Sequence, residues 1–247
     1  MERSTWSTEE GAGPPTGHEP ELQDAFGRIE RLVDEGNPDL GRLGFWRLVA
    51  EVKADPMLER HWAEVVGRID RKAFEARIRW RVPVWLGNTI LLLGTFAGSF
   101  AVGLALGTTD EVVAGVALLL GGGIWMAAWH DLAHWMFGRI IGIRFTSYYV
   151  FGTPPWPGLK IDYASYLRTE AAGRAWMHAS GAIASKLAPF GALAFWPATD
   201  APAWAAWGLL GLGVAGIVVD VVFSVRFSDW KRVRRERRVA RAQAANA

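Results

Sequence analysis

Long uncharged stretches alternate with short polar segments along the chain, and their lengths predict its main elements. Charged residues are few within residues 82–129 and 175–225: Asp110, Glu111, Lys186, Asp200 and Asp220. About 20 helical residues are enough to cross a hydrocarbon core of ~30 Å. The pattern therefore predicts an all-α membrane protein with four transmembrane helices. We expect these helices at about 82–109, 112–135, 176–196 and 202–225.

The polar region before the first span predicts a small helical domain at residues 21–81, after a disordered tail at residues 1–20. Asp55 followed by Pro56 is typical of a helix start, because Asp caps free N–H groups and Pro fits the first turn. Apolar residues at helical spacing mark the predicted helices: Phe26, Ile29 and Val33, then Leu58, Trp62, Val65 and Ile69. These faces predict packing or membrane-surface helices, and a partner-binding role remains an alternative.

The distribution of basic residues indicates how the spans are oriented. Lysine and arginine gather before the first span, in the loop at 136–175 and in the tail at 226–247, whereas the other two connections carry only acidic residues. Basic residues favour the cytoplasmic side. We therefore expect an integral multi-pass protein of the plasma (inner) membrane, with both termini and the loop in the cytoplasm. The basic tail is expected to lie on anionic lipid, so no nucleic-acid partner is predicted.

Candidate chemistry is concentrated at two histidines near the end of the second span. His130 and His134 are four residues apart, which places both imidazoles on one helical face. The chain has no cysteine, so nitrogen and oxygen atoms must hold any metal ion. Two histidines at this spacing suit one tetrahedral metal, and Asp131 between them could act as a base on water.

A third ligand is expected from an acidic residue, for which Asp220 is the leading candidate. It is the one acidic residue within the other predicted spans, and it lies at the same depth as His130, counted from the outer edge of each span. A carboxylate buried in a membrane is costly without a cationic partner. Asp162 and Asp229 are alternative third ligands.

Other polar residues near the spans allow more than one interpretation. His178 could be a fourth ligand, a proton shuttle, an oxyanion donor or an interfacial histidine. Lys186 could extend to the interface or pair with Asp131 or Asp220. Asp220 could instead form an ion pair with Lys186 or Arg226 at a helix end.

Over residues 112–225 the order of these features resembles the site-2 protease (M50) family of intramembrane zinc metalloproteases. The similar elements are a metal-binding helix, a β-like segment, a small-residue turn and an acidic residue in the last span: residues 130–134, 138–151, 179–185 and Asp220. The resemblance implies one Zn²⁺ ion bound by His130, His134 and Asp220, with Asp131 as the general base. The chain departs from the family pattern at several points: Asp131 replaces a glutamate that is longer by ~1.5 Å, and Val221 replaces a glycine. Further departures are Ala182 for a proline, Ser185 for an asparagine, and Leu212 and Ala215 in place of an asparagine and a proline.

We therefore expect a zinc-dependent intramembrane endopeptidase that cleaves membrane-protein substrates near the cytoplasmic face, with Asp131 and His178 as its catalytic residues. A short membrane-associated β-like segment is expected after the second span, and residues 143–151 could hold an unwound substrate by strand addition. The alternative function is an inactive relative, a membrane scaffold that binds a partner. The expected partners are the lipid bilayer and a transmembrane protein.

Overall fold

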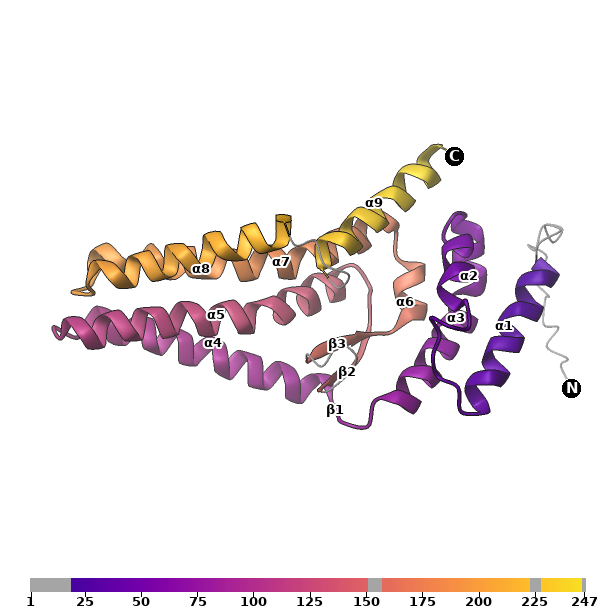
Figure 1. The fold of residues 1–247 in the computed structure, drawn as a ribbon, viewed down its shortest axis with the longest axis horizontal. Coiled ribbons are helices and arrows are strands. Elements are labelled where there is room, and N and C mark those ends of the chain that lie inside the picture. The colour runs from indigo at the N-terminus through magenta and orange to yellow at the C-terminus, as the bar shows by residue number, and fades with distance from the viewer. Residues whose placement is uncertain (1–18, 151–156, 223–227, 246–247) are drawn as a thin grey trace, which may run out of the picture.

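The computed structural model describes residues 19–150, 157–222 and 228–245. Its helices are α1 (Glu19–Asp34), α2 (Phe45–Val52), α3 (Pro56–Arg77), α4 (Val84–Gly107), α5 (Glu111–Ile140), α6 (Tyr163–Arg168), α7 (Ala171–Leu193), α8 (Ala203–Val222) and α9 (Asp229–Ala245), with a 3₁₀ turn at Trp196–Ala198. The strands are β1 (Arg81–Val82), β2 (Phe145–Tyr149) and β3 (Gly158–Ile161). The molecule is elongated, with α4, α5, α7 and α8 side by side at one end and α1–α3 at the other (Figure 1).

Helices α1–α3, here called the N-terminal unit, pack around their own apolar core. Phe26, Phe45 and Trp62 meet at its centre, where the ring centroids of Phe26 and Trp62 are 5.3 Å apart. Helix α3 begins at Pro56, and the Asp55 carboxylate accepts a hydrogen bond from the Met57 amide. The predicted helix start is therefore confirmed. The predicted disordered tail lies outside the described residues, except that Glu19 and Pro20 already belong to α1.

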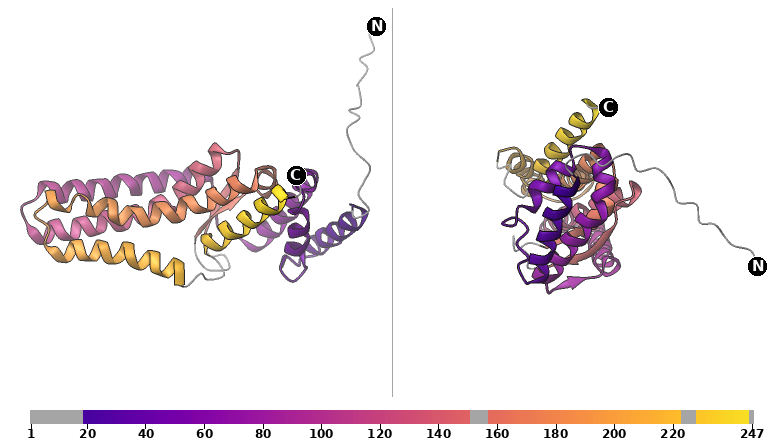
Figure 2. Two further views of the ribbon diagram at one scale, coloured as in Figure 1. Left: turned by 90° about the horizontal axis from the view of Figure 1, so that it is seen from above. Right: turned by 90° about the vertical axis from the view of Figure 1, so that its right-hand side faces the viewer.

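Within the described residues, three helices are long and apolar enough to cross a membrane: α4, α5 and α8. They correspond to the first, second and fourth predicted spans. The third predicted span falls in α7, which does not join this group. Arg174 and Lys186 make α7 more polar, and this helix lies against α5 and α8 within the bundle (Figures 1 and 2).

Small residues bring α4 and α5 close together. A Cβ atom at Gly98 would lie 2.6 Å from Cδ1 of Trp125, which is too short for an unmoved side chain. Trp125 in turn donates its indole N–H to the carbonyl oxygen of Thr95 at 3.1 Å. The glycine therefore provides the space in which a large aromatic ring can pack and satisfy its only donor.

A three-stranded antiparallel sheet lies at the end of the bundle that faces the N-terminal unit (Figure 1). Its order is β1-β2-β3, so β2 is the central strand and pairs with β1 through Tyr148 and Tyr149. The chain is mostly helical, and strand β2 follows α5, the helix that contains the second predicted span. Strand addition at residues 143–151 stays a prediction: β3 pairs along one edge of β2, and β1 pairs only with Tyr148 and Tyr149 on the other edge. Residues 151–156 lie outside the described part of the chain.

Helix α9 follows α8 in the chain and packs against α7. Its buried Val233 contacts a small apolar cluster that includes Ala175 and Ala179 of α7. The arginines and Lys231 of α9 are exposed. The predicted basic tail is therefore a helix with one face on the protein, and its first residue, Asp229, enters the site described next.

Candidate metal centre

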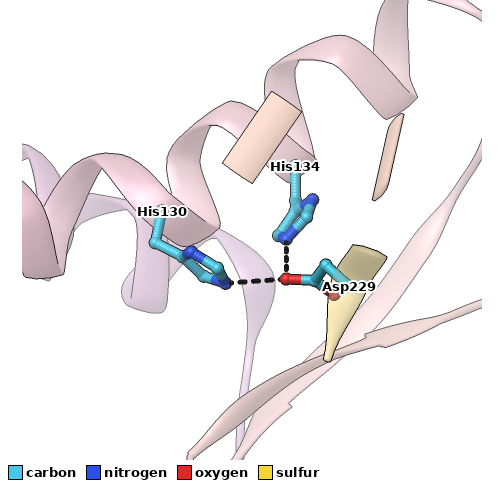
Figure 3. Close-up of side chains that lie close together, drawn as sticks. All are labelled: His130, His134 and Asp229. Atoms are coloured by element: carbon cyan, nitrogen blue, oxygen red, sulfur yellow. Dashed lines mark hydrogen bonds and ion pairs between the residues drawn. The ribbon is translucent and has the colours of Figure 1, made fainter. Parts of the chain in front are cut away.

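Two histidines of α5 converge with the first residue of α9 (Figure 3). His130 and His134 are one helical turn apart, and their ring centroids are separated by 4.8 Å. The Nε2 atom of each ring lies 3.3 Å from Oδ2 of Asp229. In the described part of the chain, these three residues form a group that could hold a metal ion.

The spacing of the three candidate ligand atoms fits a tetrahedral ion. Zinc lies about 2.0–2.1 Å from nitrogen and oxygen ligands, so the edge of a zinc tetrahedron is about 3.3 Å. Both measured N···O distances equal that edge. All three candidate ligand atoms lie within 4.8 Å of one another, so the residues present could hold a small tetrahedral cation.

Hydrogen bonds on the far side of each ring orient the histidines. Nδ1 of His134 lies 2.7 Å from the carbonyl oxygen of Met177, which can only accept, so Nδ1 carries the hydrogen. Nδ1 of His130 lies 3.4 Å from the Ser185 hydroxyl oxygen, whose own hydrogen is donated to the Ala182 carbonyl. Both imidazoles, when neutral, therefore direct the lone pair of Nε2 toward Asp229, and such carbonyl or hydroxyl partners are typical of metal-binding histidines.

The carboxylate of Asp229 is an anion in this environment. Burial favours its neutral form, but the hydrogen bonds to His130 and His134 outweigh burial and hold the pKa of Asp229 well below its usual range. Three electron-rich atoms thus converge on one point. A cation must stand between them, either as protons on the rings or as a bound metal ion.

One side of the group is open. The side chain of His130 is 36% exposed, whereas those of His134 and Asp229 are 11% and 14% exposed. Catalytic zinc sites have three protein ligands and keep a fourth position for water or substrate. The three-residue group with its exposed flank at His130 matches that arrangement.

Asp131 lies beside the group. It interacts electrostatically with His130, His134 and Asp229. Burial and then the negative charge of Asp131 raise the pKa of Tyr148 on β2. Within the described residues no hydrogen bond or ion pair engages the Asp131 carboxylate, so it is free to interact with a molecule at the open side.

Asp220, the leading candidate for third ligand, is not brought to the two histidines. Its Oδ2 lies 3.0 Å from Nζ of Lys186 and accepts a hydrogen bond from the Trp230 indole at 3.2 Å. The sequence places Asp220 at the same predicted depth as His130, but depth alone does not determine the direction in which a side chain points from α8. Asp229, one of the alternatives, takes the position instead because α9 folds back against α7.

The remaining candidates have other partners. Asp162 is buried and pairs with Arg71 and Arg144 at 3.2 Å and 3.1 Å. His178 is 3% exposed, and its Nε2 lies 2.9 Å from the hydroxyl oxygen of Tyr166. Its ring centroid is 6.4 Å from that of His134, and it is not one of the three residues of the metal group.

The sequence analysis missed the role of Gly181. A Cβ atom there would overlap Nε2 of His134, the nitrogen that faces Asp229. Residues 179–185 were noted only as a small-residue turn, and that composition was the available signal.

Comparison with known proteins gives no family assignment for this arrangement: no protein-family model, curated protein or solved structure matches the chain.

Proposed function

We propose that this chain is a zinc-dependent intramembrane endopeptidase that hydrolyses peptide bonds of membrane-protein substrates. The observation that carries the proposal is the convergence of His130, His134 and Asp229 with tetrahedral spacing at the end of an apolar helix bundle. A metal group with three protein ligands and an open side is suited to hydrolysis rather than to a purely structural role. Zinc is the proposed ion because two imidazoles and a carboxylate are common ligands of catalytic zinc.

In this proposal α4, α5, α7 and α8 all cross the membrane. Helix α7 is too polar to qualify by hydropathy, but three of its polar residues are buried: Arg174, His178 and Ser185 are 0%, 3% and 5% exposed. Lys186 is partly exposed and pairs with Asp220 of α8. A helix of this kind can span a bilayer when neighbouring helices satisfy its polar groups. The basic flanks then place both termini, α9 and the site on the cytoplasmic side of the plasma membrane.

The chemistry is divided among the residues around the open side. A zinc ion bound here would polarise a peptide carbonyl and lower the pKa of water. His130 and His134 hold their lone pairs in fixed directions, and Asp229 supplies one negative charge. Asp131 would accept a proton from the attacking water, because it carries no other hydrogen bond among the described residues. His178 would act through Tyr166 or the packing of His134, since it does not reach the open side.

The experiment is a cleavage assay with purified protein in lipid nanodiscs and a transmembrane reporter peptide. We expect cleavage by the wild type that is lost on removal of zinc and restored by its return. Asp131→Asn should abolish cleavage with zinc still bound, whereas Asp131→Glu should retain or increase it, because the longer side chain keeps the base. A zinc-loaded wild type that cleaves no transmembrane peptide, with no gain from Asp131→Glu, would contradict the protease proposal.

A second candidate function is an inactive membrane scaffold, and one observation favours it. Asp229 touches both histidines directly at 3.3 Å, so protonated rings could join α9 to α5 without metal. A scaffold of this type should remain folded and bind its partner after zinc removal. Purified wild type that lacks stoichiometric zinc, together with a loss of stability in His130→Ala, would favour the scaffold.

A further inference from the structure

A buried cluster of charged residues joins the N-terminal unit to α9. We define the charged cluster as Lys53, Glu59, Arg174, Glu236 and Gln243, contributed by the end of α2, by α3, by α7 and by α9. Its four ionisable side chains are between 0% and 4% exposed. No part of the proposed hydrolysis uses these residues.

Glu236 is the centre of the charged cluster. One of its oxygens accepts a hydrogen bond from Lys53, and the other accepts one from Arg174 at 2.8 Å. Arg174 also donates to Glu59 at 2.6 Å, so each buried charge has a partner of opposite sign. Buried charges hold a fixed geometry because loss of one partner leaves the other uncompensated.

Two members of the charged cluster, Glu236 and Gln243, lie on α9, the helix that begins with Asp229. Glu236 follows Asp229 by seven residues, which is two turns and about 10 Å along α9. Between them Val233 is the one apolar side chain of α9 that is fully buried among the described residues. Apolar packing of α9 is therefore confined to its contact with α7, and the charged cluster adds buried ion pairs that connect α9 to the N-terminal unit.

The far end of α9 makes a second link to the N-terminal unit. The Gln243 side-chain amide donates to the Lys53 carbonyl oxygen and to Glu59, both at 3.1 Å. The three candidate ligands are thus held in place by two different sets of contacts. Helix α5 fixes His130 and His134 from within the bundle, whereas α9 holds Asp229 through contacts with α7 and, in addition, with the N-terminal unit outside the bundle.

From this arrangement we propose that Lys53, Glu59, Arg174, Glu236 and Gln243 are positioning residues for the metal site, so that the N-terminal unit sets zinc affinity by holding Asp229 in place. The inference rests on the metal site of the proposed function. It implies that a ligand or partner that displaces the N-terminal unit releases Asp229 and weakens zinc binding. Without Asp229 the two histidines alone bind the ion with two ligands in place of three.

The test is the apparent zinc affinity of the full chain in nanodiscs, measured by competition with a chelator. Lys53→Met removes a charge from the N-terminal unit far from the histidines and should weaken zinc binding about tenfold, the scale of outer-shell effects on metal sites. Lys72→Met is the matched control, because Lys72 pairs with Glu30 and Asp34 inside the same unit. It should change zinc affinity by less than about twofold.

Gln243→Ala keeps the test valid if Lys53→Met does not fold. It removes two hydrogen bonds without stranding a buried charge and should weaken zinc binding about threefold. Thermal unfolding without zinc, measured in parallel, distinguishes positioning of the metal site from a merely structural role. A merely structural role lowers the stability of the variant but leaves its zinc affinity unchanged. Wild-type affinity in both Lys53→Met and Gln243→Ala, or an equal loss in Lys72→Met, would overturn the inference. Failure of the wild type itself to bind zinc would instead reject the metal site, and the inference with it.

Discussion

Gly181 of α7 lies so close to the imidazole of His134 that a Cβ atom at this position would overlap the ring nitrogen Nε2. That nitrogen faces Asp229 and is the one that would bind a metal ion. We predict that Gly181→Ala displaces the ring and lowers zinc affinity at least about tenfold, as other losses of ligand orientation do. Equilibrium zinc titration of the purified variant measures the change.

Gly191→Ala is the matched control for this substitution. Gly191 lies on the same helix, and a Cβ atom there would meet no other atom within 4 Å. Alanine is the better helix former, so this variant should bind zinc normally and be as stable as the wild type or slightly more so. Equal zinc affinity in the two variants would show that His134 does not need the space left by Gly181.

Substitution of Lys186 and Asp220 tests whether Asp220 is the ion-pair partner of Lys186 or a metal ligand. Lys186→Met leaves the Asp220 carboxylate with only the Trp230 indole among the contacts described, and should lower the free energy of unfolding by about 1–3 kcal/mol. The double variant Lys186→Met/Asp220→Leu should recover most of that loss, because apolar replacement of both partners removes the stranded charge. Denaturant unfolding measures both, and zinc content should be unchanged in each.

Ser185 is predicted to orient His130. Its hydroxyl oxygen lies 3.4 Å from Nδ1 of His130 and also 3.4 Å from Nζ of Lys186. Ser185→Ala leaves the Nδ1 hydrogen without this partner, so the ring can turn and zinc affinity should fall about tenfold. Ser99→Ala is a suitable control, because the Ser99 hydroxyl donates to the Thr95 carbonyl on α4, away from both histidines. Equal affinities for these two variants would argue against orientation by Ser185.

Acidic pH should weaken the contacts that hold α9 against the rest of the protein. Burial favours the neutral form of Glu236, but the charges of Lys53 and Arg174 prevail and lower its pKa from 4.5 to about 2. Glu236 therefore binds a proton more readily in the unfolded chain than in the folded one. The stability that its ionised carboxylate contributes is present above about pH 4.5 and is lost as the pH falls toward 2. Unfolding measured from neutral pH down to about pH 3 should show a shallower loss for Glu236→Gln than for the wild type. Parallel curves would contradict this assignment.

The sequence predicted the elements of the bundle well because hydrophobic runs and helix caps are local signals. The spans at 82–109, 112–135 and 202–225 match long apolar helices, and Asp55 caps α3 as expected. The pairing of His130 with His134 was equally accessible, because residues four apart on a helix must share a face. Helix α7 was identified through its apolar length, although its polar residues lower its hydropathy.

The contacts between distant segments could not be predicted in the same way. Asp220 and Asp229 are both acidic residues near the end of the last span, and only the return of α9 along α7 decides which of them meets the histidines. Similarly, β1 consists of the two residues Arg81 and Val82 and has no sequence signal of its own. Its pairing with Tyr148 and Tyr149 depends on the position of β2 after α5 has formed.

The most direct test of the account is zinc quantification of four purified proteins: wild type, His134→Ala, Asp229→Asn and Asp220→Asn. The arrangement of His130, His134 and Asp229 predicts about one zinc per chain in the wild type and in Asp220→Asn, and a severe loss in His134→Ala and Asp229→Asn. Zinc retained by Asp229→Asn but lost from Asp220→Asn, or no zinc in the wild type, would contradict it.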